Sequence, residues 1–273
     1  MEANLQRRVQ RYGWDKAADY YEEFWRKQLE PAQTRLLELA ALKPGERVLD
    51  IACGTGLVTF PAAEAVGPGG EVVGTDISQG MIDVVRRIAA ERGTANVSFD
   101  RMDAEDLGGL PDASFDAALT ALGLMYVPDV VQALKEQNRV LKPGGRAVAA
   151  VWGQRDRCGW AEIFPIVESH IKSDVCPMFF QMGTQDVLSR TMQMAGFADV
   201  THERLPSTLR YESDEEAIGA AYLGGPVALA YSRMDDATRE AAHKEYLDSI
   251  AAYRDGQGYN VPGEFVVGIG WKR

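Results

Sequence analysis

Residues 48–56 read Val-Leu-Asp-Ile-Ala-Cys-Gly-Thr-Gly, and this stretch decides the fold. Its apolar first half predicts a short buried strand, and its glycines predict a tight turn into the helix that follows. Glycine lacks a Cβ atom and tolerates a positive φ, so the backbone of such a turn can approach a ligand closely. A Gly-x-Gly pair by itself also fits an ordinary strand-to-helix turn. The rest of the chain therefore has to distinguish a ligand-binding turn from a purely structural one.

Short apolar strands alternate with amphipathic helices after this stretch. The turns between them carry Gly and Pro, as in residues 67–70 and 142–145. Such an alternation predicts βαβ units around a parallel sheet. The predicted strands are 47–51, 71–75, 97–101, 115–121 and 146–152, and the predicted helices are 57–66, 78–92 and 129–141.

The two ends of the chain carry weaker patterns. Apolar side chains recur at helical spacing before and after Pro31, which predicts a break into two helices within the first forty residues. After Trp152 the pattern predicts helices at 160–171 and 185–195, a strand at 199–205, two or three helices within 214–253 and a last strand at 264–271.

The composition of the 273 residues is that of an ordinary globular protein, with 46% hydrophobic and 25% charged residues. A formal net charge of −11 and the lack of a basic patch argue against a nucleic-acid partner. Three cysteines, Cys53, Cys158 and Cys176, form no Cys-x-x-Cys pair, which argues against a disulfide framework. No signal peptide and no apolar run of the roughly 18 residues of a membrane span are evident. We therefore expect a cytoplasmic protein without a membrane partner; its oligomeric state is open, a homodimer included.

Two further acidic residues follow predicted strands at matching places. Asp76 lies twenty residues after Gly56, where a carboxylate can accept hydrogen bonds from both hydroxyls of a ribose. Asp103 follows the third strand, where it can accept a hydrogen bond from the exocyclic amine of adenine. With Asp50 in the first stretch, three matching strand ends predict a ligand that contains adenosine.

The segment from 44 to 152 resembles the class I S-adenosylmethionine-dependent methyltransferases. The resemblance rests on five motifs in order, at residues 48–56, 75–81, 102–104, 114–116 and 140–145. It implies a Rossmann-like, doubly wound α/β sheet of seven strands, the last antiparallel, with N-terminal helices and a helical cap, and S-adenosyl-L-methionine as the cofactor. The implied parts of this single domain are 1–43 (helical cover), 44–153 (cofactor-binding core) and 154–273 (completion of the sheet with the substrate cap).

The resemblance also implies which residues bind each part of the cofactor. The methionine end would lie against Asp50, the turn from Gly54 to Gly56, and Thr120 and Ala121; the ribose against Asp76; and the adenine against Asp103, the Ala104 amide, Ile77 and Met81. Tyr20 and Trp25 would close over the cofactor from the N-terminal helix. The remaining members of the predicted cofactor site are Ala52, Cys53 and Glu105.

A nicotinamide dinucleotide is the competing cofactor, since it also uses a glycine turn and an acid after the second strand. Its fingerprint requires Gly or Ala at the sixth position of Gly-x-Gly-x-x-Gly, where this chain has Thr59. Asp50 beside the turn also favours a cationic sulfonium over a diphosphate, because a carboxylate repels phosphate.

The methyl acceptor is expected above the fourth and fifth strands. By resemblance Tyr126 faces the substrate, and Trp152 ends the fifth strand at the ligand-binding edge. The cap would complete the pocket with Trp160, Phe164 and Phe180, and Met178 lies in the same apolar stretch. His170 is the first candidate for a general base and Tyr126 the second catalytic candidate, although positioning alone can drive methyl transfer. The three histidines are scattered, so no metal site is expected.

The sequence thus predicts a methyltransferase that moves the methyl group of S-adenosylmethionine by in-line displacement to a small, apolar or aromatic molecule. Two alternatives stay open. The motif order also resembles the quinone-biosynthesis enzymes that methylate a ring carbon, from which residues 123–126 depart. The other is a cofactor-binding protein without turnover, because the motifs report binding only.

Overall fold

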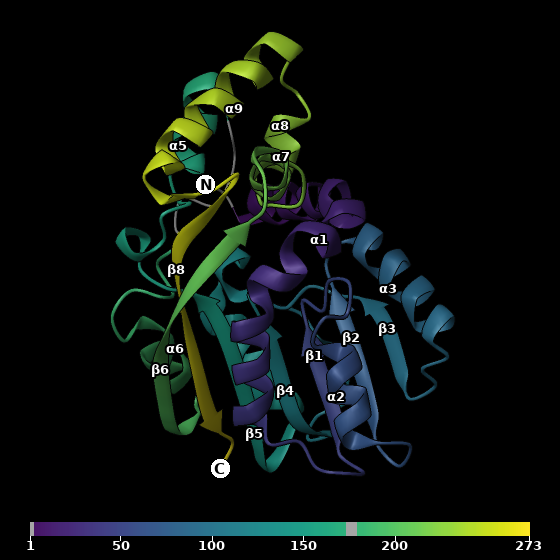
Figure 1. The fold of residues 1–273 in the computed structure, drawn as a ribbon. Helices are drawn as coiled ribbons and strands as arrows, with labels where there is room; N and C mark the ends of the chain where they lie inside the picture. The colour runs from purple at the N-terminus through teal and green to yellow at the C-terminus, as the bar shows by residue number, and fades with distance from the viewer. Residues whose placement is uncertain (1–2, 173–178) are drawn as a thin grey trace.

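A single twisted sheet forms the centre of the molecule (Figure 1). The computed structural model describes residues 3–172 and 179–273; Cys176 and Met178 lie outside the described residues. The long strands follow the order β3-β2-β1-β4-β5-β8-β6, and β8 runs antiparallel to both of its neighbours. The predicted doubly wound sheet with an antiparallel last strand is confirmed. The strands are β1 (Arg47–Ile51), β2 (Glu71–Asp76), β3 (Val97–Arg101), β4 (Phe115–Ala121), β5 (Leu141–Trp152), β6 (Ala198–Tyr211), the two-residue β7 (Arg254–Asp255) and β8 (Gly258–Trp271).

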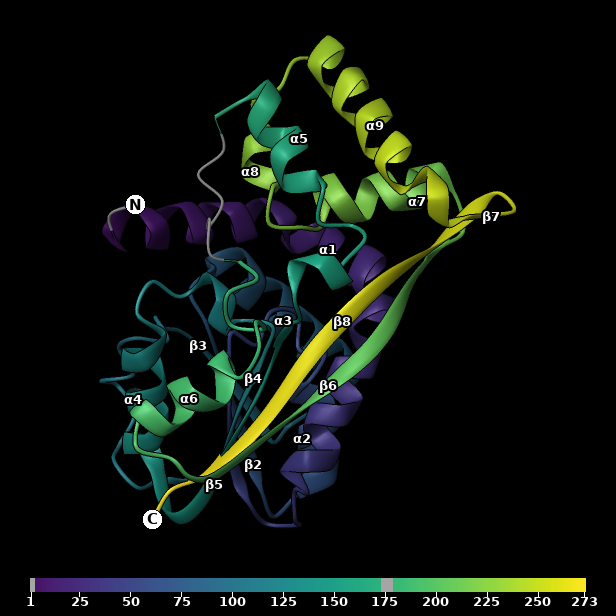
Figure 2. The ribbon, with the colours of Figure 1, turned by 90° about the vertical axis from the view of Figure 1, so that its left-hand side faces the viewer.

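Helices cover both faces of the sheet, and further helices form a cap above its carboxyl edge. Figure 2 shows α4 and α6 on one face, α2 and the lower part of α1 on the other, and α5, α7, α8 and α9 in the cap. Ser78 caps α3 by accepting a hydrogen bond from the Met81 amide, as the sequence predicts. The helices are α1 (Ala3–Ala40), α2 (Thr59–Val66), α3 (Gln79–Arg92), α4 (Val130–Val140), α5 (Ile163–His170), α6 (Val187–Met194), α7 (Asp214–Ile218), α8 (Ala228–Tyr231) and α9 (Asp236–Ile250), with a π-helical turn at Gly219–Leu223 and 3-10 turns at Leu124–Tyr126, Arg155–Arg157 and Ala251–Tyr253.

The N-terminal segment is one helix of 38 residues, so the predicted break at Pro31 is wrong. Proline removes one helical hydrogen bond. The residues around it, Leu29, Ala32 and Leu36, are fully or almost fully buried, and this burial keeps the helix continuous. The helix changes direction along its length: its first part crosses the carboxyl edge of the sheet beneath the cap, and its second part descends along the sheet face (Figures 1 and 2).

Two predicted boundaries differ from the structure near the antiparallel strands. Residues 142–145 are predicted as a turn but lie within β5. They form an irregularity in that strand, because its pairing with β4 passes from the pair Phe115–Leu141 directly to the pair Ala117–Arg146. Strands β6 and β8 are each 14 residues long, roughly twice the predicted length, and pair from Ala198 to Tyr211. The residues that the prediction leaves out include Pro206 and Pro262, which argue against a strand in a sequence pattern, whereas the mutual pairing of the two strands continues through both.

No helix within the described residues is long and apolar enough to span a membrane.

Candidate active site

A cavity with about 740 Å³ of empty space, its open mouth included, lies at the carboxyl edge of the sheet, where the strand order reverses between β1 and β4. Open α/β sheets bind ligands at such a reversal. We call it the large cavity. Its walls come from α1 (Arg7, Gln10, Trp14, Tyr21), from the end of β1 (Ile51, Ala52, Gly54), from the end of β2 (Asp76, Ile77, Met81), from the end of β3 (Met102, Asp103, Ala104) and from the end of β4 (Ala121, Leu122, Gly123, Tyr126, Val127, Pro128).

The turns after β1 and β4 have unusual backbones where they line the cavity. Ala52 and Leu122 have φ values of 57° and 59°, which costs about 1 to 3 kcal/mol for each non-glycine residue. The two turns pack closely, because a Cβ atom added to Gly123 would lie 2.6 Å from the Cβ atom of Ala52. Strain at two cavity-lining turns is typical of a functional site.

Asp76 is held at the floor of the large cavity by two backbone amides. Gly54, at φ 54°, donates its N–H to one carboxylate oxygen at 3.0 Å, and Ser78 donates to the other at 2.9 Å. Burial raises the pKa of Asp76 to about 6, although these two hydrogen bonds lower it. The carboxylate is therefore fixed in orientation and keeps lone pairs for a ligand.

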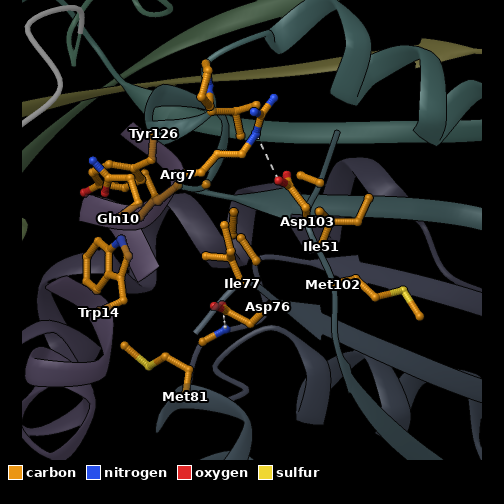
Figure 3. Close-up of a pocket in the computed structure, with 18 of the residues that line it drawn as sticks. Arg7, Gln10, Trp14, Ile51, Asp76, Ile77, Met81, Met102, Asp103 and Tyr126 are labelled. Atoms are coloured by element: carbon orange, nitrogen blue, oxygen red, sulfur yellow. Dashed lines mark hydrogen bonds and ion pairs between the residues drawn. The ribbon is translucent and has the colours of Figure 1, made fainter. Parts of the chain in front are cut away.

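Asp103 lies on the opposite side of the cavity and contacts α1. Figure 3 shows the Arg7 guanidinium reaching from α1 toward Asp103, and their nearest atoms are 3.1 Å apart. Arg7 also binds Glu105 at 2.5 Å. Glu105 in turn accepts the Asp129 amide at 2.7 Å, just before α4. Glu105 thus ties α1 to α4 and does not line the cavity, whereas Ala104 does.

Apolar side chains line the cavity near the two acids. Ile77 and Met81, predicted as cofactor contacts, line the large cavity, and Met102 joins them from the end of β3 (Figure 3). A flat apolar ring with polar edges can be held by such apolar walls with carboxylates beside them.

Seven predicted cofactor residues do not line the cavity: Glu105, Asp50, Trp25, Cys53, Gly56, Thr120 and Tyr20. Cys53 lies in a separate apolar cluster, and burial raises the pKa of its thiol. Gly56 packs against Phe60 instead: a Cβ atom added to Gly56 would lie 2.5 Å from the nearest atom of the Phe60 ring. The Thr120 hydroxyl accepts a hydrogen bond from Gln137, on α4. Tyr20 is 42% exposed and outside the lining, which its neighbour Tyr21 joins.

Asp50 is also set apart from the large cavity. It is 1% exposed and accepts a 2.5 Å hydrogen bond from the Thr59 hydroxyl of α2. Burial raises the pKa of Asp50 to about 7; the Thr59 bond lowers it and the nearby Asp76 carboxylate raises it. Successive strand residues point to opposite sides, so Asp50 faces α2 while Ile51 lines the cavity.

The Asp50→Asn substitution tests whether Asp50 contacts the cofactor. The pKa of Asp50 in the folded protein exceeds its value of about 3.9 in the unfolded chain, so the wild type loses stability as the pH rises from about 4 to about 7. Asparagine cannot ionise, so the melting temperature of the variant should exceed that of wild type at pH 8, and the gain should shrink toward pH 4. Cofactor affinity, measured by calorimetry, should be unchanged; weaker binding would assign Asp50 to the methionine end after all.

Helix α1 supplies the lining residues that the sequence analysis missed. Arg7, Gln10, Trp14 and Tyr21 all reach the large cavity from this helix. Trp14 and Tyr21 are seven residues apart and share one helical face, so their apolar spacing was a usable signal. Arg7 and Gln10 carry no such signal, because a polar helix face is usually solvated.

A second cavity, with about 300 Å³ of empty space including its open mouth, adjoins the first beneath the cap, and we call it the small cavity. Four residues line both cavities: Trp14, Tyr21, Leu122 and Tyr126. The other walls of the small cavity are Trp25, Leu29, Trp152, Trp160, Phe179, Gly225 and Pro226. Its lining therefore contains the predicted acceptor residues Tyr126, Trp152 and Trp160. Trp25, predicted to cover the cofactor, lines only this cavity.

Phe164 and Phe180 lie behind the lining of the small cavity. Their rings pack on Trp160 at centroid distances of 5.7 and 5.6 Å. His170, the candidate base, lies between two cap helices, where its ring nitrogen is 3.1 Å from Glu245 of α9, and it lines neither cavity.

Sequence comparisons match this chain to methyltransferases. A family model described as a methyltransferase domain matches residues 48–145. The nocamycin O-methyltransferase of Saccharothrix syringae is 39% identical over 89% of this chain and 91% of its own length. The aklanonic acid methyltransferase DauC of Streptomyces sp. strain C5 is 41% identical over 49% of this chain, a match that spans 60% of that protein. The demethylmenaquinone methyltransferase of Listeria monocytogenes is 32% identical over 73% of this chain and 83% of its own length.

Solved structures share the fold at lower identity. The YcgJ protein of Bacillus subtilis superimposes with a TM-score of 0.61 at 20% identity, over 89% of this chain and 99% of its own. The [4+2]-cyclase SpnF superimposes with a TM-score of 0.55 at 21% identity, over 88% of this chain and 80% of its own. The matched sequences and the cavity at the end of β1 agree, and the chain belongs to the S-adenosylmethionine-dependent methyltransferases.

Proposed function

We propose that this enzyme methylates an oxygen atom of a small aromatic or apolar molecule, which binds in the small cavity while the cofactor binds in the large one. The observation that carries the proposal is the shared wall: Trp14, Tyr21, Leu122 and Tyr126 line both cavities. The two cavities are therefore adjacent, as the donor and acceptor sites of a transfer reaction have to be. The similarity to an O-methyltransferase over 89% of the chain supports oxygen as the accepting atom.

The residues of the large cavity fit S-adenosylmethionine. Its lining combines apolar walls with the two carboxylates of Asp76 and Asp103, the mixture that ligand pockets use to hold and orient a small molecule. Asp76 would accept hydrogen bonds from the ribose hydroxyls, and Asp103 with the Ala104 amide would bind the adenine edge. Gly54 and Ala52 would let the backbone approach the methionine end. When bound, the cofactor supplies a methyl group that its positive sulfur already activates.

The small cavity is suited to position an acceptor and to exclude water rather than to supply a strong base. Its lining within the described residues contains no Asp, Glu, His, Lys or Arg side chain. Its only ionisable groups are the phenols of Tyr21 and Tyr126, and burial followed by the charge of Asp76 raises the pKa of Tyr21. Tyr21 therefore stays protonated at neutral pH and can donate a hydrogen bond.

These walls favour an acceptor that brings its own nucleophile. A carboxylate, an acidic phenol or an enol is ionised, or nearly so, without a base from the enzyme. Apolar walls exclude water and strengthen the attraction between such an anion and a positively charged sulfur. Alignment of the two groups can supply roughly 7 to 11 kcal/mol of the barrier in favourable cases.

Two alternative functions give different products. The demethylmenaquinone relative favours methylation of a quinone ring carbon as the second candidate. The third candidate is cofactor binding without methyl transfer, because the sequence motifs of the large cavity report binding only.

A panel assay separates these functions. Cofactor with a deuterated methyl group is incubated with the enzyme and with aromatic hydroxy ketones, aromatic carboxylic acids and demethylated naphthoquinols, and products are analysed by mass spectrometry and NMR. We expect a deuterated O-methyl product. A C-methyl product would favour the second candidate, and no release of S-adenosylhomocysteine with any acceptor would favour the third.

We expect activity to survive removal of metal ions. No group of three or more His, Cys, Asp or Glu side chains in residues 3–172 and 179–273 is placed to hold a metal ion. Transfer from a sulfonium needs no Lewis acid. The rate should be equal with and without EDTA; activity that disappears with EDTA and returns with Mg²⁺ or Zn²⁺ would contradict this prediction.

We also propose a cytoplasmic enzyme without a nucleic-acid partner. The net charge of −11 disfavours a polyanion. Cys53 and Cys158 are buried free thiols, which suits a reducing compartment.

A further inference from the structure

Trp160 has a buried polar atom without a partner. The residue is 3% exposed, lines the small cavity, and its indole nitrogen makes no hydrogen bond within the described part of the chain. Trp25, which lines the same cavity, differs: its indole N–H donates to the Ala220 carbonyl at 3.2 Å. Of these two neighbouring tryptophans, one has its donor paired within the described residues and Trp160 does not.

The surroundings of Trp160 offer aromatic rings. The ring centroids of Trp152, Phe179 and Trp25 lie 4.8, 5.6 and 6.0 Å from that of Trp160. Phenylalanine has no hydrogen-bond acceptor, and the indole N–H of tryptophan only donates. A buried donor without a partner costs free energy, and native proteins pair the large majority of their buried side-chain polar atoms with a protein group or an ordered water.

We propose that the Trp160 indole donates a hydrogen bond to an oxygen of the methyl acceptor, and that this bond selects aromatic molecules that carry a carbonyl or a similar oxygen. The inference rests on the proposed function, in which the small cavity holds the acceptor. The aromatic walls bind any flat apolar molecule of suitable size. A donor placed among them discriminates, because an analogue without the oxygen leaves the N–H unpaired on binding.

A matched pair of probes tests the hydrogen bond without knowledge of the natural acceptor. The probes are 1-tetralone, a bicyclic aromatic ketone, and tetralin, its parent hydrocarbon without the oxygen. The five tryptophans are labelled with ¹⁵N in the full-length enzyme saturated with S-adenosylhomocysteine. The Trp160→Phe variant identifies the indole resonance of Trp160 by its disappearance.

We expect 1-tetralone to move the Trp160 indole proton downfield and tetralin to leave it nearly in place. We also expect wild type to bind the ketone about tenfold more tightly than the hydrocarbon, equivalent to about 1.4 kcal/mol. Equal shifts with both probes, an unmoved resonance although the ketone binds, or no binding of either probe would overturn the proposal.

The Trp160→Phe variant provides a second, independent readout. Phenylalanine keeps an aromatic ring but has no N–H, so the preference for the ketone should fall from about tenfold to near unity. Trp271→Phe is the matched control, because Trp271 is 38% exposed and lies outside the small cavity. It pairs with Arg146 at one end of the β5–β8 ladder, whereas the cavity residue Trp152 lies at the other end. If Trp160→Phe folds poorly, single Trp→Phe variants of the other four tryptophans assign their own resonances and identify that of Trp160 by elimination, so the wild-type NMR test can still be read.

The outcome is separable from that of the proposed function. Methyl transfer without any probe preference would overturn only the role of Trp160. A ketone preference that depends on Trp160, in a protein that releases no S-adenosylhomocysteine with any acceptor, would support the oxygen-binding site and remove the proposed methylation.

Discussion

Replacing Trp152 by alanine is expected to lower kcat/KM for the methyl acceptor by about thirtyfold, the effect of losing an aromatic anchor worth about 2 kcal/mol. Cofactor affinity should stay nearly unchanged, because Trp152 lines the small cavity and not the large one. The indole is 3% exposed and packs on Phe265 and Trp160 at 4.3 and 4.8 Å. Its loss opens the wall that would position an aromatic acceptor. Cofactor titration by calorimetry and acceptor kinetics on the same preparation measure both effects.

The same packing makes stability the necessary control. Truncation of a buried tryptophan typically costs about 3 to 5 kcal/mol, so the folded fraction has to be measured by circular dichroism. Trp152→Phe fills more of the space and should show a smaller loss of kcat/KM in the same direction. Trp271→Ala, at an exposed position, should change neither the folded fraction nor kcat/KM for the methyl acceptor. Loss of cofactor binding in a folded Trp152 variant, or unchanged acceptor kinetics, would show that the acceptor binds elsewhere.

Replacing Asp76 by alanine should weaken S-adenosylmethionine and S-adenosylhomocysteine equally, by about 10- to 150-fold. Both ligands carry the same ribose, and a hydrogen bond to a charged group is worth about 1.5 to 3 kcal/mol. Because burial raises the pKa of Asp76 to about 6, wild-type affinity should fall as the pH drops below about 6 and the carboxylate gains a proton. The variant should lack this pH dependence. Calorimetric titrations with both ligands at pH 5 and pH 8 test these expectations.

Asp100→Ala is the matched control for Asp76. Asp100 lies on the neighbouring strand β3, and its side chain is 60% exposed beside Arg86. Its removal changes the net charge by the same amount but should leave both affinities unchanged. Unequal losses for the two ligands in Asp76→Ala would indicate contact with the methionine end instead of the ribose. An unchanged affinity would remove Asp76 from the site.

Local patterns in the sequence determined the core of the sheet and the acids at its edge. A short parallel strand ends where its apolar pattern ends, and the residues at and just after that end are delivered to the carboxyl edge whatever surrounds them. Asp76, Asp103 and Ile77 line the large cavity for this reason. The Ser78 cap is equally local, since it depends on an amide only three residues away.

Tertiary structure alone decided which side chains of α1 and of the cap meet these strand ends. Helical spacing defines an apolar face but not the element that the face contacts, so Tyr21 and not Tyr20 reaches the cavity. The ion pair of Arg7 with Asp103 joins residues 96 positions apart, and no local pattern encodes such a contact. Burial of Leu29 and Leu36 likewise overrides the helix-breaking tendency of Pro31. Local interactions determine where strands and helices form, whereas burial between elements distant in sequence determines which residues share a cavity.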